Sequence, residues 1–68
     1  MITLEAARKN AGLSQAELAK ILGVEQMTIS RWENGKTFPD IRYFKKISML
    51  SGVSMNDIEI PDIETSKK

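Results

Sequence analysis

The segment from Gln26 to Asn34 carries polar side chains at helical spacing, and these side chains suit hydrogen bonding to the edges of nucleic-acid bases. At about 100° per residue, one side of the segment gathers the outward set Gln26, Met27, Ser30, Arg31 and Asn34. The Gln26 amide offers a donor and an acceptor together, which match adenine N6 and N7. Arg31 can bind guanine or phosphate. The opposite side holds Ile29, Trp32 and Glu33, so we expect Trp32 in the core.

The sequence lacks several residue types that enzymes use for catalysis. The chain contains no Cys and no His, which excludes a Ser-His-Asp hydrolase, a thiol nucleophile, a disulfide and a His/Cys zinc site. The four glycines lie far apart, so the sequence has neither a P-loop nor a dinucleotide-binding motif. We therefore expect a protein that is not an enzyme and that uses no cofactor, metal ion or small-molecule substrate.

Length and composition indicate one folded domain. The chain has 68 residues, of which 41% are hydrophobic, as in ordinary globular proteins. No apolar run approaches about 18 residues, and charged residues interrupt the start of the chain, so the sequence predicts a cytoplasmic protein without a membrane span or signal peptide. Basic side chains outnumber acidic ones in residues 1–46, and the reverse holds in residues 47–68. This distribution suits one anion-binding face and a separate second role.

Capping residues divide the chain into short helices. Ser14-Gln-Ala-Glu17 is a capping box, in which each of Ser14 and Glu17 accepts a hydrogen bond from the backbone amide of the other. The predicted helices run from Thr3 to about Asn10, from Ser14 to about Leu22, from about Gln26 to Asn34, from Asp40 to about Ser51, and from Ser54 to before Pro61. The alternation in residues 57–60 also fits a short strand. The predicted fold class is all-α: a compact bundle of five short helices in residues 1–60, followed by a partly disordered tail, 61–68.

Residues 15–34 have the residue types of a helix-turn-helix at the positions where that motif requires them. Ala19 is small where the two helices must cross closely, and Gly23 stands where the turn needs a positive φ. The residues available for packing between the two helices are Leu18, Leu22, Val24, Ile29 and Trp32. Two helices joined this tightly form a helix-turn-helix and not a long hairpin.

Three stretches carry a resemblance to a known family: GLSQAELAKILGV, TISRWENGKTFPD and GVSMNDI. Through them the span from Leu4 to Ile58 resembles the phage lambda repressor and Cro-like family of helix-turn-helix proteins, also called the XRE family. Members of that family are sequence-specific binders of double-stranded DNA that regulate transcription, mostly in bacteria and their phages. The resemblance implies a nucleoid-associated, bacterial or phage-encoded regulator that reads a palindromic operator with its third helix in the major groove.

The resemblance also implies roles for individual residues. Base contacts are implied for Gln26, Met27, Ser30 and Arg31. Contacts to the DNA backbone are implied for Gln15, Thr28, Asn34, Gly35, Lys36, Thr37 and Arg42. The family commonly buries an Arg–Glu ion pair between its first and third helices, and Arg8 and Glu33 occupy the matching positions as a structural pair.

Two positions of the predicted recognition helix depart from the family pattern. Met27 replaces a polar residue that is common there, and it either packs on a thymine methyl group or fills a gap in the core. Glu25 stands where the family prefers a Ser or Thr cap, and near DNA it repels phosphate unless it accepts from cytosine N4. The sequence leaves the role of Glu25 open.

The C-terminal part of the chain bears on assembly. Met55, Ile58, Ile60 and Ile63 either dock onto the chain's own core or form the seam of a homodimer. We favour a homodimer, at least on DNA, because paired recognition helices one DNA turn apart fit a palindrome and add affinity. Two other functions stay open: a helix-turn-helix module that binds another protein, such as an antitoxin or antirepressor partner, and the N-terminal domain of a longer repressor.

Overall fold

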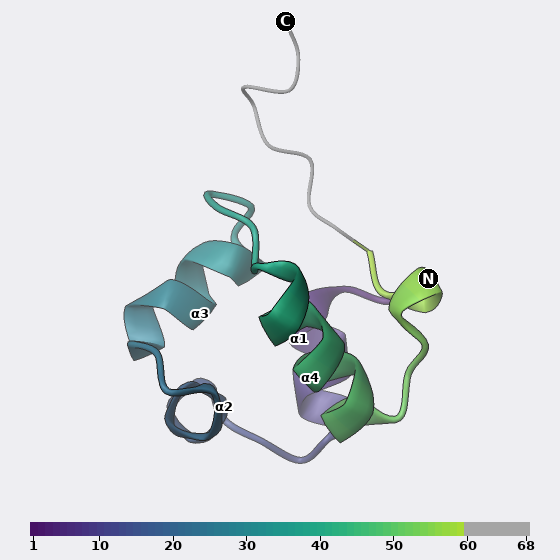
Figure 1. Cartoon of the computed structure of the whole chain (residues 1–68), viewed down its shortest axis with the longest axis horizontal. Helices are drawn as coiled ribbons and strands as arrows, with labels where there is room; N and C mark the ends of the chain where they lie inside the picture. The colour runs from purple at the N-terminus through teal and green to yellow at the C-terminus, as the bar shows by residue number, and fades with distance from the viewer. Residues whose placement is uncertain (60–68) are drawn as a thin grey trace, which may run out of the picture.

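In residues 1–59, which the computed structural model describes, four α-helices and one 3₁₀ turn surround a shared hydrophobic core (Figure 1). In chain order the elements are α1 (Leu4–Asn10), α2 (Gln15–Leu22), α3 (Gln26–Glu33), α4 (Ile41–Ser51) and η1 (Met55–Asp57). α2 and α3 pack together on one side of the molecule, and α1 and α4 pack together on the other (Figure 1). The all-α prediction is confirmed, but the prediction of a fifth α-helix is wrong.

Side-chain caps fix where α1 and α2 begin. The Thr3 hydroxyl accepts a hydrogen bond from the Ala6 amide at 3.0 Å. The Ser14 hydroxyl accepts from the Glu17 amide at 3.0 Å, and the Glu17 carboxylate accepts from the Ser14 amide at 2.8 Å. The predicted capping box is therefore confirmed. α2 ends at Gly23, whose φ of 73° is the left-handed conformation that the sequence predicted for this turn.

The core draws side chains from all four α-helices and from the segment after η1. Its buried members are Leu4, Ala7, Leu18, Ala19, Leu22, Ile29, Trp32, Phe44, Ile47 and Ile58. Trp32 packs against Tyr43 of α4 with ring centroids 5.6 Å apart, so this indole belongs to the core, as predicted. α3 is thereby held against both α2 and the rest of the molecule by its apolar side.

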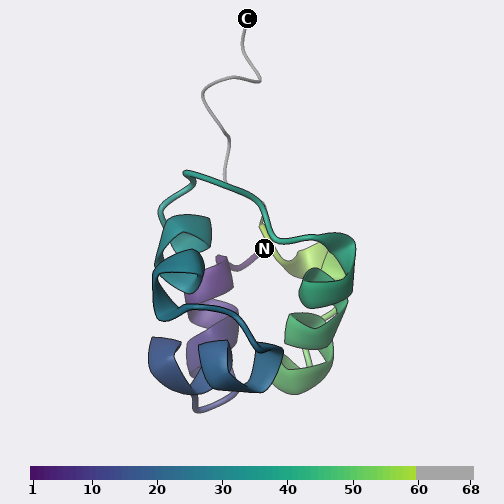
Figure 2. The same cartoon turned by 60° about the vertical axis from the view of Figure 1, so that its left-hand side comes forward.

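A long-range backbone pairing explains why the fifth helix does not form. The Ser54 hydroxyl accepts from the Asn56 amide, as a cap should, but the turn that follows spans only three residues. Ile58 then adopts an extended conformation and forms a parallel β-bridge with Ile2, where the Ile2 amide donates to the Asp57 carbonyl at 2.8 Å. Figure 2 shows the start of the chain beside this last described segment. The suggested strand in residues 57–60 is thus represented by a single bridge in the described residues.

Candidate nucleic-acid interface

The outer face of α3 is available to a ligand. Ile29 and Trp32 are almost completely buried, whereas Gln26 and Arg31 are exposed and Ser30 is half-buried. Met27 is 61% exposed, which rules out the interpretation that it fills a gap in the core. The predicted division of this helix into a core side and an outward side is therefore confirmed.

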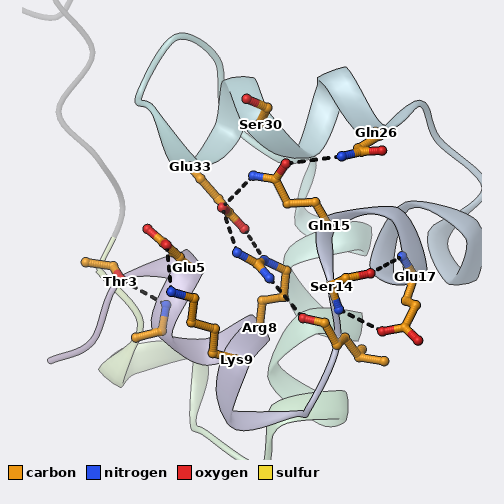
Figure 3. A network of polar contacts seen from close by, with 12 residues as sticks. Thr3, Glu5, Arg8, Lys9, Ser14, Gln15, Glu17, Gln26, Ser30 and Glu33 are labelled. Carbon is orange, nitrogen blue, oxygen red and sulfur yellow. Dashed lines mark hydrogen bonds and ion pairs between the residues drawn. The ribbon is translucent and has the colours of Figure 1, made fainter.

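Beneath this face lies the ion pair between Arg8 of α1 and Glu33 of α3 (Figure 3). The Arg8 Nε atom donates to Glu33 Oε2 at 2.6 Å, and the side chains are only 9% and 7% exposed. Arg8 Nη2 also reaches Glu33 Oε1 at 3.3 Å, and Nη1 donates to the Leu13 carbonyl at 2.9 Å. The hydrogen bond to Glu33 raises the pKa of Arg8 above its ordinary value. The predicted Arg–Glu pair is present and joins α1 to α3.

Gln15, the first residue of α2, links this buried pair to the outer face. Its Nε2 atom donates to Glu33 Oε1 at 3.0 Å, and its Oε1 atom accepts from Gln26 Nε2 at 3.5 Å (Figure 3). Because a carboxylate only accepts hydrogen bonds, Glu33 dictates which end of the Gln15 amide points inward. The Gln15 oxygen must then point outward, and it orients the amino group of Gln26. We call Arg8, Glu33, Gln15 and Gln26 the polar network.

A shallow open hollow of about 460 Å³ lies at the start of α3. Its lining residues are Gln15, Glu25, Gln26, Met27 and Ser30. Glu25 is the N-cap residue of α3, but its side chain makes no capping hydrogen bond. The hollow therefore brings together three of the four predicted base-contacting residues, one predicted backbone-contacting residue and the carboxylate that the sequence left without a role.

At the end of α3, two backbone amides are already engaged within the chain. The Gly35 amide donates to the Trp32 carbonyl at 3.2 Å, and the Lys36 amide donates to the Arg31 carbonyl at 2.9 Å. The Gly35 amide is thus already engaged by its own chain, and the expected contact of Gly35 with the DNA backbone stays a prediction. The exposed side chains here are Asn34, Lys36 and Thr37, while Thr28 in the first turn of α3 is half-buried. Asn34 Nδ2 also donates to Ser30 Oγ at 3.3 Å.

Arg42, another residue implied to contact the DNA backbone, is engaged within its own helix start. Asp40 caps α4 by accepting from the Arg42 amide at 2.9 Å, and the same carboxylate accepts from Arg42 Nε at 3.1 Å. This contact lowers the pKa of Asp40 and raises that of Arg42. The guanidinium carbon also lies 5.8 Å from the centroid of the Tyr43 ring. This pair was not predicted, although an Asp two residues before an Arg at a helix start indicates it in the sequence.

The residues of the suggested dimer seam are only partly described. Ile58 is 3% exposed and Met55 is half-buried against the core, so both pack onto their own chain. Ile60, Ile63 and the predicted tail 61–68 lie outside the described residues.

In residues 1–59, no group of three or more His, Cys, Asp or Glu side chains could hold a metal ion. None of the helices described here has the length and hydropathy needed to cross a membrane.

Comparison with known proteins places this chain among helix-turn-helix domains. The helix-turn-helix family HTH_3 matches residues 4–58. The chain is 34% identical over 55 residues to the HTH-type transcriptional activator BcrR of Enterococcus faecalis, an alignment that covers 81% of this chain and 27% of that protein. It is 32% identical over 57 residues to the ImmF control region 10 kDa protein of Bacillus phage phi105, covering 84% of this chain and 63% of that protein.

A third relative comes from an archaeon. An uncharacterized HTH-type transcriptional regulator of Methanocaldococcus jannaschii is 44% identical over 48 residues, which are 71% of this chain and 73% of that protein. The chain thus spans most of this relative, but only about a quarter of BcrR and less than two thirds of the phage protein. No solved structure matches the chain significantly.

Proposed function

Because this chain belongs to the HTH_3 helix-turn-helix family of transcription regulators, we propose that it is a sequence-specific binder of double-stranded DNA. In this proposal α3 enters the major groove, α2 crosses the phosphate backbone, and the bound protein blocks or recruits RNA polymerase at a palindromic operator. The names of two relatives, a transcriptional activator and a phage control-region protein, support a role in transcription.

The observation that carries the proposal is the state of the Gln26 side chain. Gln26 is exposed on the outer face of α3, and one of its two amino hydrogens is directed at Gln15 Oε1. The second amino hydrogen and the Gln26 Oε1 atom are left over, and this pair of groups matches adenine N6 and N7. A side chain that a neighbouring residue already holds in place loses less conformational entropy on binding a base than a side chain that moves freely. Gln26 therefore reads adenine in this proposal, and Met27, Ser30 and Arg31 contact neighbouring bases.

Side chains around α3 supply the contacts to phosphate. Lys36 and Thr37 are exposed just beyond its end, Asn34 is its C-cap residue, and Thr28 is half-buried in its first turn. Gln15 lies at the start of α2, where free backbone amides favour an anion. Each phosphate neutralised by a cation releases counterions, so binding weakens steeply as salt rises. Arg42 contributes less than its charge suggests, because Asp40 already accepts from its guanidinium group.

A palindromic operator calls for two copies of the chain on the DNA. Two recognition helices about 34 Å apart span one turn of the duplex, and linking two weak modules multiplies their affinity. Ile58 is buried in its own core and Met55 packs partly against that core. The proposed seam therefore consists of the part of Met55 that stays exposed, together with Ile60 and Ile63. Sedimentation velocity of the protein with and without a selected operator tests this assembly, and one bound copy per operator would contradict it.

The function is tested by selecting bound sites from a random pool of duplexes and measuring mobility shifts on them. Gln26→Ala should relax the choice of one base pair, whereas Lys36→Ala should weaken binding to all sequences alike and reduce the salt dependence. Lys45→Ala is the matched control, because Lys45 is an exposed cation on α4. Equal losses for Gln26→Ala and Lys36→Ala on every sequence would contradict the assigned roles.

One observation favours a second function, binding of another protein. Exposed apolar side chains of α2 and α4, namely Ile21, Met49 and Leu50, surround a shallow groove beside Lys46. Larger apolar patches of this kind mark interaction sites. If this function is the main one, the wild-type chain retards no DNA at low salt, and Met49→Asp releases a co-purifying partner.

A further inference from the structure

The carboxylate of Glu25 has no partner in the part of the chain that the structure describes. Its backbone carbonyl accepts from the Thr28 amide at 3.0 Å and so begins α3, but its side chain does not cap the helix. The side chain takes part in none of the hydrogen bonds or ion pairs formed within residues 1–59. An exposed, unpaired acid at this position does not stabilise the fold through contacts, so its surroundings decide what it can do.

Those surroundings are the hollow at the start of α3, which carries no compensating cation. Its other lining residues, Gln15, Gln26, Met27 and Ser30, are all uncharged. The cations near α3, Arg31 and Lys36, lie at its far end. The recognition surface is therefore acidic where α3 begins and basic where it ends, and Glu25 lies next to the base reader Gln26.

The chemistry of the major groove limits what such a carboxylate can contact. Cytosine N4 and adenine N6 are donors there, whereas guanine O6 and N7 and thymine O4 are acceptors. A carboxylate only accepts, so opposite guanine or thymine it would lose its water without gaining a hydrogen bond. Adenine also presents its N7 acceptor beside N6, which leaves cytosine as the base with the best match.

We propose that Glu25 is a specificity-determining residue, which selects cytosine at the base pair next to the one read by Gln26 and rejects guanine and thymine there. This inference rests on the proposed function, because it requires α3 in the major groove. One good contact of this kind discriminates by about 5- to 150-fold between bases. In this proposal the carboxylate lowers the overall affinity for DNA, because it repels phosphate. Its benefit is that it weakens binding to sequences with guanine or thymine at this position.

The test uses an operator selected with the wild-type chain and a set of duplexes in which each base pair is varied in turn. Glu25→Ala should abolish the cytosine preference at one position and raise affinity for duplexes with guanine or thymine there. Glu25→Gln should shift that preference toward adenine, which a Gln amide matches. Glu59→Gln is the control, because it removes one exposed carboxylate away from α3 and should leave the base profile unchanged. Far-UV circular dichroism should be the same for all four proteins.

Two results would overturn the proposal, and they differ. If Glu25→Ala raises affinity by the same factor on every duplex, Glu25 only repels phosphate and reads no base. If the wild-type chain selects no duplex at any salt concentration, the proposed function fails and the role of Glu25 fails with it.

Discussion

The two ends of the polar network differ in burial and in charge. At the inner end Arg8 and Glu33 are enclosed by α1 and α3, and at the outer end Gln26 faces solvent. A buried charge without its partner destabilises a protein severely, whereas an exposed amide exchanges its contacts with water. The inner end therefore bears mainly on folding stability, and the outer end is the one to which the proposed function assigns base recognition. Gln15 belongs to both, because it contacts Glu33 and Gln26.

Removing the inner cation should have the largest effect. Arg8→Ala leaves the Glu33 carboxylate buried without its ion pair, and we expect it to lower the free energy of unfolding by about 3–5 kcal/mol. Urea denaturation followed by circular dichroism measures this loss. Arg42→Ala is the matched control, because its exposed pair with Asp40 is screened by water and should matter little. If the two variants lose similar free energies of unfolding, burial does not make the Arg8–Glu33 pair more important for stability than the exposed Arg42–Asp40 pair.

Removing the connecting residue should have an intermediate effect on both properties. Gln15→Ala deletes a hydrogen bond to a carboxylate, and we expect a loss of about 1–3 kcal/mol in the free energy of unfolding. It should also weaken the adenine preference assigned to Gln26. Ser14→Ala is the control at the same helix start, because loss of the cap costs about 1 kcal/mol without touching Gln26. If both variants leave base preference intact, the network does not orient Gln26.

Removing the outer residue should leave stability almost unchanged. For Gln26→Ala we expect a change of less than about 0.5 kcal/mol in the free energy of unfolding, as for other surface substitutions, and a clear loss of base preference. In the double variant Gln15→Ala/Gln26→Ala the two effects on base preference should not add, because the residues share one interaction. Strict additivity in mobility-shift measurements would show that the two amides act independently.

The smallest effect is expected outside the network, at the start of α4. Arg42 lowers the pKa of Asp40, so this carboxyl binds its proton less readily in the folded chain than in the unfolded chain. Its contribution to stability is therefore present at neutral pH and disappears as the pH falls below about 4. The melting temperature of Asp40→Asn should lie slightly below that of the wild type at pH 7, and the difference should vanish in acid. A difference that persists at pH 2 would contradict this account.

The sequence predicted the features of this fold that depend on near neighbours. The capping box at Ser14, the turn at Gly23 and the two sides of α3 all follow from residues within a few positions of one another. Burial of Arg8 with Glu33 was anticipated through the family resemblance, and the structure confirms that pair. The sequence therefore indicated the residues that line the hollow at the start of α3.

The features that the sequence did not predict depend on contacts with distant or competing groups. Ser54 signals a helix start, but pairing of Ile58 with Ile2 draws the chain into an extended conformation after one turn. Gln15 was assigned to phosphate alone, since nothing local indicates that it lies between Glu33 and Gln26. The sequence placed Met27 on the outward side of α3 but left open whether it fills a gap in the core, because its degree of burial depends on how α3 lies against α2.

The β-bridge between Ile2 and Ile58 brings the first and the last described residues side by side, so that both ends of the described chain pack against the same core. The Ile2 carbonyl accepts from the Glu59 amide, and the Ile2 amide donates to the Asp57 carbonyl, so Ile2 holds the residues on both sides of Ile58. Trimming the chain before Thr3 would free the segment after η1 and expose Ile58 to water. Removal of Met1 and Ile2 therefore acts on residues more than fifty positions further along the chain.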